Sequence, residues 1–155
     1  MFKTSRVSYG GTAAIVTSMA LVSGLGAANA TRPVIVSALL IAALADNLTD
    51  SLSIHIFQES EQLEQREAFT GTVTNFLTRL LICLSFVPLI WVLPATAAAV
   101  SSAAWGMSLL AVLTFLVARE RKVGTGLEVV KHLTVALGVI LVSKAIGHLI
   151  RAMLG

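Results

Sequence analysis

Charged residues are scarce in this chain of 155 residues. They make up only 12% of the sequence, whereas hydrophobic residues make up 56%, and a soluble domain of this size normally carries about 25% charge. The mean hydropathy is positive. A chain with so little polar surface needs lipid as its solvent, so we predict an integral membrane protein.

Cysteine is nearly absent, and the net charge is small. The single cysteine, Cys83, excludes a disulfide framework and a thiolate metal site. The formal net charge of +3 is too small and too scattered along the chain to indicate nucleic-acid binding.

Long apolar runs are what the sequence does have. A bilayer crossing takes about 20 residues, and lipid offers no hydrogen-bond partner to an open backbone, so spanning segments must be helices or closed barrels. None of the runs shows the alternation of a barrel strand. We therefore predict an all-α membrane protein with one domain, residues 1–155, and five transmembrane helices at about residues 10–30, 33–58, 69–93, 96–118 and 124–150.

Basic residues set the expected orientation. Lys3 and Arg6 precede the first span, and further basic residues follow the second and fourth spans, among them Arg66, Arg119 and Arg121. The positive-inside rule then places the N-terminus in the cytoplasm and the C-terminus outside, as in a multi-pass protein of a bacterial or archaeal inner membrane. An alternative remains open: the Ala28-Asn29-Ala30 sequence after the first apolar run could be a signal-peptide cleavage site.

The second apolar segment is expected to run on as a long helix. No Pro or Gly occurs from Val34 to Ala68, so nothing local stops the helix. We expect it to extend into the cytoplasm and to turn sharply near Arg66 to Ala68 into the third span.

Two aspartates interrupt this second segment. Counting about 1.5 Å per residue from Val34 puts Asp46 roughly 18 Å into the hydrocarbon layer, and Asp50 one turn further on, with Asn47 beside them on the same helical face. A carboxylate there costs at least about 2.5–3.5 kcal/mol, so such residues usually mark an ion path. Carboxylate and amide oxygens suit divalent ions such as Mn²⁺ or Fe²⁺.

Other potential ligands lie around this pair. Further polar residues follow the aspartates towards the cytoplasm, and a methionine in the first span could add a thioether. The predicted metal-binding set is Asp46, Asn47, Asp50, Met19, His55, Glu59, Glu61 and Glu64. We predict no catalytic residue and no bound cofactor, because the metal is the transported ion.

Each of these assignments has a structural alternative. The aspartates could instead form an internal ion pair with Arg79 or Lys131, although both basic residues are expected nearer the cytoplasm, at the level of His55, where they could snorkel to the interface. Met19 could simply be packed in the bundle. His55 could be a hydrogen-bonded interfacial residue, and the glutamates a solvated helix end.

Three stretches resemble a known family. The first span, AAIVTSMALVSGLGAA from Ala13 to Ala28, resembles the opening helix of the vacuolar iron transporter family, which reads Asp-Gly-Ile-Val-Thr-Thr before an apolar run. SFVPLIWVLP around Pro88 and the closing Ile-Gly-His-Leu-Ile are similar as well. The resemblance implies five spans, a homodimer with the ion path along the subunit interface, and proton-coupled export of Fe²⁺ or Mn²⁺ from the cytoplasm.

The sequence also departs from the family pattern. The first-span aspartate of the family falls on Ala13, and its metal-binding methionine of the second span falls on Asp50. The long cytoplasmic metal-binding insertion is missing. The resemblance is therefore to a short form of the family.

These observations predict a transporter of divalent metal ions, homodimeric and embedded in the bilayer. The main alternative is a membrane-embedded interaction or assembly subunit whose acids pair with a partner. A third alternative, an intramembrane hydrolase, is less favoured. Paired catalytic aspartates must be able to share a proton, and none of the other spans carries a Gly-Asp motif that could supply a partner aspartate.

Overall fold

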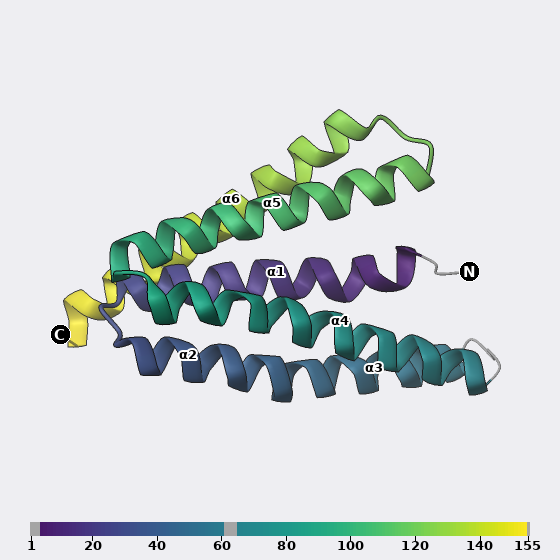
Figure 1. Ribbon diagram of the computed structural model, residues 1–155, viewed down its shortest axis with the longest axis horizontal. Coiled ribbons are helices and arrows are strands. Elements are labelled where there is room, and N and C mark those ends of the chain that lie inside the picture. The colour runs from purple at the N-terminus through teal and green to yellow at the C-terminus, as the bar shows by residue number, and fades with distance from the viewer. Residues whose placement is uncertain (1–3, 61–64, 155) are drawn as a thin grey trace.

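The computed structural model describes residues 4–60 and 65–154, and these are almost entirely helical. In Figure 1 the axes of the helices are roughly aligned and form one bundle. The first helix begins at one end of this bundle, and the last helix ends at the opposite end. The helices are α1 (Thr4–Ala27), α2 (Arg32–Ile41), η1 (Ala42–Asp46), α3 (Asn47–Ser60), α4 (Gln65–Val92), α5 (Ala95–Glu120) and α6 (Thr125–Leu154).

The helices α2, η1 and α3 follow one another without a break and count as one span. With α1, α4, α5 and α6, the described residues thus contain five helical segments that are long and apolar enough to cross a membrane. The candidate spans are Gly10–Ala27, Arg32–Phe57, Phe69–Val92, Thr96–Glu120 and Thr125–Leu154. The prediction of an all-helical protein with five membrane-spanning helices is confirmed at this level. The orientation in the membrane and the extension into the cytoplasm stay predictions.

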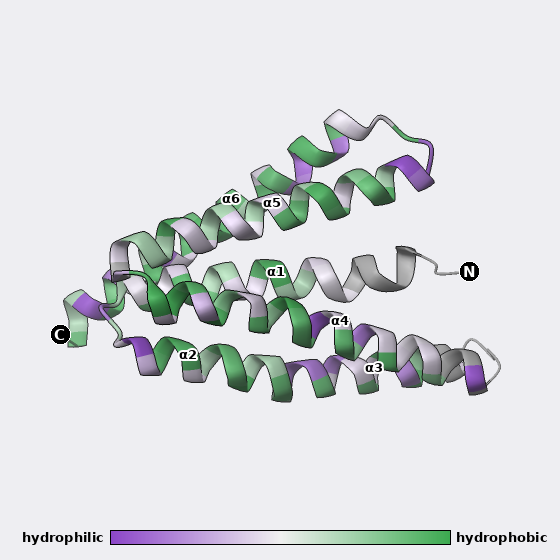
Figure 2. Cartoon of the chain, viewed as in Figure 1, coloured by the Kyte–Doolittle hydropathy of each residue, from purple (hydrophilic) through white to green (hydrophobic). Residues whose placement is uncertain are grey.

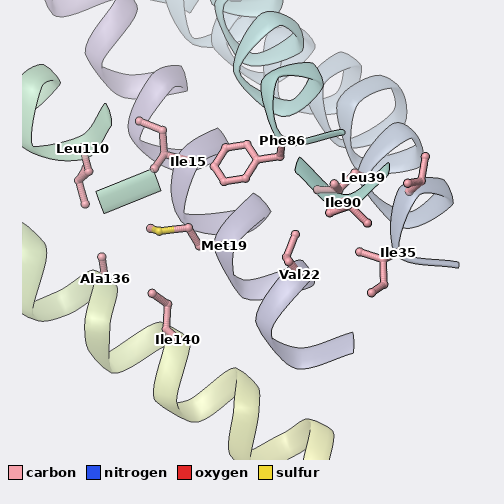
Figure 3. Close-up of a cluster of buried hydrophobic side chains, with 11 residues drawn as sticks. Ile15, Met19, Val22, Ile35, Leu39, Phe86, Ile90, Leu110, Ala136 and Ile140 are labelled. Atoms are coloured by element: carbon pink, nitrogen blue, oxygen red, sulfur yellow. The ribbon is translucent and has the colours of Figure 1, made fainter. Parts of the chain in front are cut away.

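Helix α1 is the centre of the bundle. It packs against α4, α5 and α6, and its buried face carries Ile15, Met19 and Val22, which meet Phe86 of α4 and Leu110 of α5 (Figure 3). Removing α1 as a signal peptide would strip this core of its middle. Whether the first helix is removed as a signal peptide stays a question for the intact mass of the purified protein.

Small residues let α1 and α6 approach closely. A Cβ atom added to Gly147 of α6 would overlap the backbone oxygen of Gly24 in α1, and a Cβ on Gly24 would lie 3.1 Å from the backbone oxygen of Ser143. Helices in lipid gain little from burying apolar surface against each other, so they associate through close packing and polar contacts. The contact between α1 and α6 therefore depends on close packing of the two backbones at Gly24 and Gly147.

The residues predicted to form the turn between the second and third spans are helical. Helix α3 ends at Ser60 and α4 begins at Gln65, so Arg66 to Ala68, the predicted turn, lie inside α4. Moving the turn of an antiparallel hairpin shifts the facing residues by twice as many positions. The register that results brings Thr72 of α4 to His55, Asn75 to Ser51 and Arg79 to Asn47.

Candidate functional site

Arg79 of α4 is at the centre of a polar cluster between α4 and the second span. Its side chain is only 3% exposed, and it donates to three side chains. Nη2 bonds to Asp46 Oδ2 at 2.7 Å, Nη1 to Asp50 Oδ2 at 2.9 Å, and Nε to Asn47 Oδ1 at 2.7 Å. We call Asp46, Asn47, Asp50, Asn75 and Arg79 the arginine cluster.

The internal ion pair considered as an alternative is therefore formed. The expectation that Arg79 lies at the level of His55 was wrong, because it followed from placing the turn near Arg66 to Ala68, which lie inside α4. Lys131, the other basic residue considered, pairs with Glu128 on its own helix at 3.1 Å.

A break in regular α-helix occurs where the cluster begins. The segment from Ala42 to Asp46 forms a π-helical turn, and the side chain of Asn47 donates from Nδ2 to the backbone oxygen of Ala43 at 2.6 Å. This bond turns Asn47 Oδ1 towards Arg79. Single π-turns inside α-helices occur frequently at functional sites.

Asn75 completes the cluster from the α4 side. Its Nδ2 lies 3.3 Å from both Asp50 Oδ2 and Ser51 Oγ, whereas its buried Oδ1 has no hydrogen-bond partner in the described part of the chain. Gly10 of α1 faces this oxygen, and a Cβ at that position would overlap it. An acceptor oxygen beside a carboxylate is thus available to a further donor or to a cation.

The cluster carries an uncompensated charge, because one arginine faces two aspartates. Asp46 remains 53% exposed and Asp50 24% exposed on the outside of this single chain. Both aspartates lie within the candidate span Arg32–Phe57, and Arg79 lies within Phe69–Val92. Figure 2 shows the resulting hydrophilic bands partway along the α3–α4 hairpin, between green, hydrophobic stretches.

The remaining predicted ligands are not all brought to this place. Met19 is 1% exposed and packs in the apolar core, where its Sδ lies against Gly106 of α5. Its role in this structure is therefore core packing. His55 lies further along α3, with Nδ1 3.3 Å from Thr72 Oγ1. Glu61 and Glu64 lie outside the described residues, as does the side chain of Glu59.

No group of three His, Cys, Asp or Glu side chains converges within the described part of one chain. A metal ion held here would need oxygens of the amide type, such as those of Asn47 and Asn75, or ligands from a second chain. Carboxylate and carbonyl oxygens together are a donor set for hard divalent ions.

Sequence reasoning missed two members of this neighbourhood, Ser51 and Asn75, and considered Arg79 as a partner only in the alternative reading. Asn75 and Arg79 are four positions apart in the third span, hence on one helical face. That spacing, matched to Asp46 and Asp50 on the preceding helix, was the available signal.

Comparisons with known proteins do not place the chain: no protein-family profile, curated protein or solved structure matches it. The similarity to the vacuolar iron transporter family thus depends on the residues quoted above.

Proposed function

We propose that this chain is a transporter of divalent metal ions, Fe²⁺ or Mn²⁺, which moves metal out of the cytoplasm in exchange for protons. The ion would pass the arginine cluster, with Asp46 and Asp50 as its charged ligands. The chain would act as a homodimer with the cluster of each copy facing the other. No enzymatic step is part of this proposal.

One observation carries the proposal: the cluster has one negative charge more than it has positive charge, and the half-exposed Asp46 carries much of the exposed carboxylate surface. Within a membrane-spanning segment such a charge is costly, and it persists where an ion path or a partner uses it. A purely structural ion pair would be neutral and fully enclosed.

Charge counting supports a two-fold arrangement. Each cluster has two carboxylates and one guanidinium, so two copies facing one another carry two excess negative charges. One divalent cation between them neutralises the whole assembly. Two-fold symmetry is also the commonest form of homo-oligomer.

Arg79 then has the role of a tethered cation. Its guanidinium lies within 2.9 Å of the Oδ2 atom of both carboxylates, so a metal ion bound to these carboxylates would compete with Arg79 for their charge. A proton that neutralises either aspartate weakens its hold on Arg79 in the same way. This shared competition couples metal to protons.

The test is metal uptake by the purified protein, alone, in liposomes that hold a fluorescent metal indicator. We expect Fe²⁺ or Mn²⁺ entry well above that of empty liposomes, accelerated by a pH gradient. Absence of entry for both metals, from protein shown to be folded, would refute transport by this chain.

A second function has support from the same surface. Leu44, Leu48 and Leu52, each more than half exposed, flank Asp46 along the second span. A partner helix with one basic residue could cover this stripe and neutralise the cluster, as in an assembly subunit. Uptake by the chain alone would argue against this role.

A further inference from the structure

A second polar site, apart from the arginine cluster, lies at the end of the bundle where α1 ends and α2 begins. A cavity of about 330 Å³ is bounded there by residues of five helices, α1, α2, α4, α5 and α6. Three of its lining residues carry basic groups: Arg32 of α2 and Lys144 and His148 of α6. None of the described residues that line it is acidic.

Among the described residues, these basic groups have no acidic partner. Neither Arg32 nor Lys144 forms an ion pair or side-chain hydrogen bond with any described residue. The sequence has no Asp or Glu before Asp46, and none after Glu128. Glu128 is about 24 Å from Lys144 along α6. An anion from outside the chain would meet no competing carboxylate among the described residues at this end.

The other residues that line the cavity indicate which kind of anion would fit it. Val22, Ile35 and Ile90, all buried, form an apolar floor, whereas the basic groups come from residues exposed at the surface. Lys144 is near the last turn of α1, because its neighbour Ser143 lies against Gly24. Arg32 opens the candidate span Arg32–Phe57, so the basic groups lie near one edge of the membrane.

We propose that this cavity binds the phosphate of an anionic phospholipid, with Arg32 and Lys144 as the charged contacts and the apolar floor against the lipid's glycerol and upper acyl chain. Basic pockets between transmembrane helices bind lipid headgroups in this way. A free phosphate ion would satisfy the cations and leave the floor unfilled. The proposal is independent of the transported ion.

The test uses the full chain in phosphatidylcholine vesicles with a trace of a photoactivatable phosphatidylglycerol. A phosphatidylcholine probe with the same chains is the reference. We expect phosphatidylglycerol to label the peptides that line the cavity more strongly. The double variant R32Q/K144Q should lower this labelling by at least about fivefold, the weight of one basic residue near an anionic headgroup. R119Q/K122Q removes the same charge at the opposite end and should leave it unchanged.

Three outcomes would overturn the proposal. Equal labelling by the two probes would make the cavity an ordinary lipid-facing surface. Loss of labelling by millimolar inorganic phosphate, without loss of fold, would assign the site to a free anion. Labelling that survives R32Q/K144Q would exclude the named contacts. Because the double variant could fold poorly, the charge-preserving R32K/K144R provides a second check and should keep the labelling.

Discussion

Two helix contacts in this bundle are built in different ways, although α4, like α5 and α6, meets α1 through the apolar core. On one side, α5 and α6 meet α1 through apolar residues and glycines, with Gly147 against the α1 backbone. On the other, α3 and α4 are joined by the arginine cluster and by Asn75 and Ser51. The same chain therefore packs helices in two ways: by close apolar contact, and by a charged cluster whose burial in lipid costs free energy.

The comparison bears on function because the expensive solution was not required for folding. A buried ion pair is weak evidence for stability, since well-packed apolar residues often do as well or better. The α1–α6 crossing demonstrates that this chain can pack helices without charge. The proposed binding of an ion or a partner would account for the charges of the cluster.

The largest effect should follow from removing Arg79. Arg79→Gln leaves Asp46 and Asp50 beside each other without their cation, and breaking a buried pair from one side costs about 3–5 kcal/mol. Reversible unfolding by sodium dodecyl sulfate in mixed micelles, followed by circular dichroism, measures this loss of unfolding free energy.

The matched control neutralises all three charges. In Asp46→Asn/Asp50→Asn/Arg79→Gln no unpaired charge remains, so most of the lost stability should return even though no ion pair is restored. If the triple variant were as unstable as Arg79→Gln, the cluster would be a structural element whose shape matters more than its charge.

A smaller loss is expected on the apolar side. In Gly147→Ala the new methyl group would overlap the backbone oxygen of Gly24, and overpacking of this kind typically costs about 1–3 kcal/mol. Gly138 is the control on the same helix, since a Cβ there has nothing within 4 Å. Gly138→Ala should be neutral or stabilise by up to about 1 kcal/mol. Equal effects of the two variants in the same unfolding assay would contradict the close α1–α6 crossing.

The smallest effect should come from the polar end of the hairpin. Glu64 lies outside the described residues, so its expected role follows from the sequence alone. Glu64→Gln should raise the metal concentration for half-maximal uptake by about two- to threefold at low salt, and the difference should vanish at high salt, where exposed charges are screened. A difference that persisted at high salt would point to direct ligation by Glu64.

The sequence predicted the helices better than it predicted their contacts. Apolar length fixes a span, so residues 33–58 were expected where Arg32–Phe57 is observed. The boundary between the second and third spans has no such marker, because no Pro or Gly occurs from Val34 to Ala68 to stop the helix. That one uncertain boundary displaced the α3–α4 register and with it the partner of both aspartates.

The candidate site was predicted in part for a related reason. Charge inside an apolar run identifies Asp46 and Asp50 without any knowledge of the neighbours. Met19, by contrast, could be assigned only by knowing which face of α1 it occupies, and that face is in the core beside Gly106. Side chains whose role depends on a helix's rotation are beyond what composition can indicate.

The most direct test of the proposed transport site is the Fe²⁺ and Mn²⁺ flux of Asp50→Asn in liposomes. This change keeps the size and one oxygen of the side chain, and Arg79 keeps its bond to Asp46, so folding should be retained while the excess negative charge disappears. Thr49→Ala is the control, since the Thr49 hydroxyl donates to the backbone oxygen of Ala45, one turn earlier in the same span, and to no other described residue. We predict that flux falls at least about tenfold in Asp50→Asn, the lower bound for losing a group that supports a metal site, and stays unchanged in Thr49→Ala. Full flux through folded Asp50→Asn would contradict the assignment of the arginine cluster as the ion path.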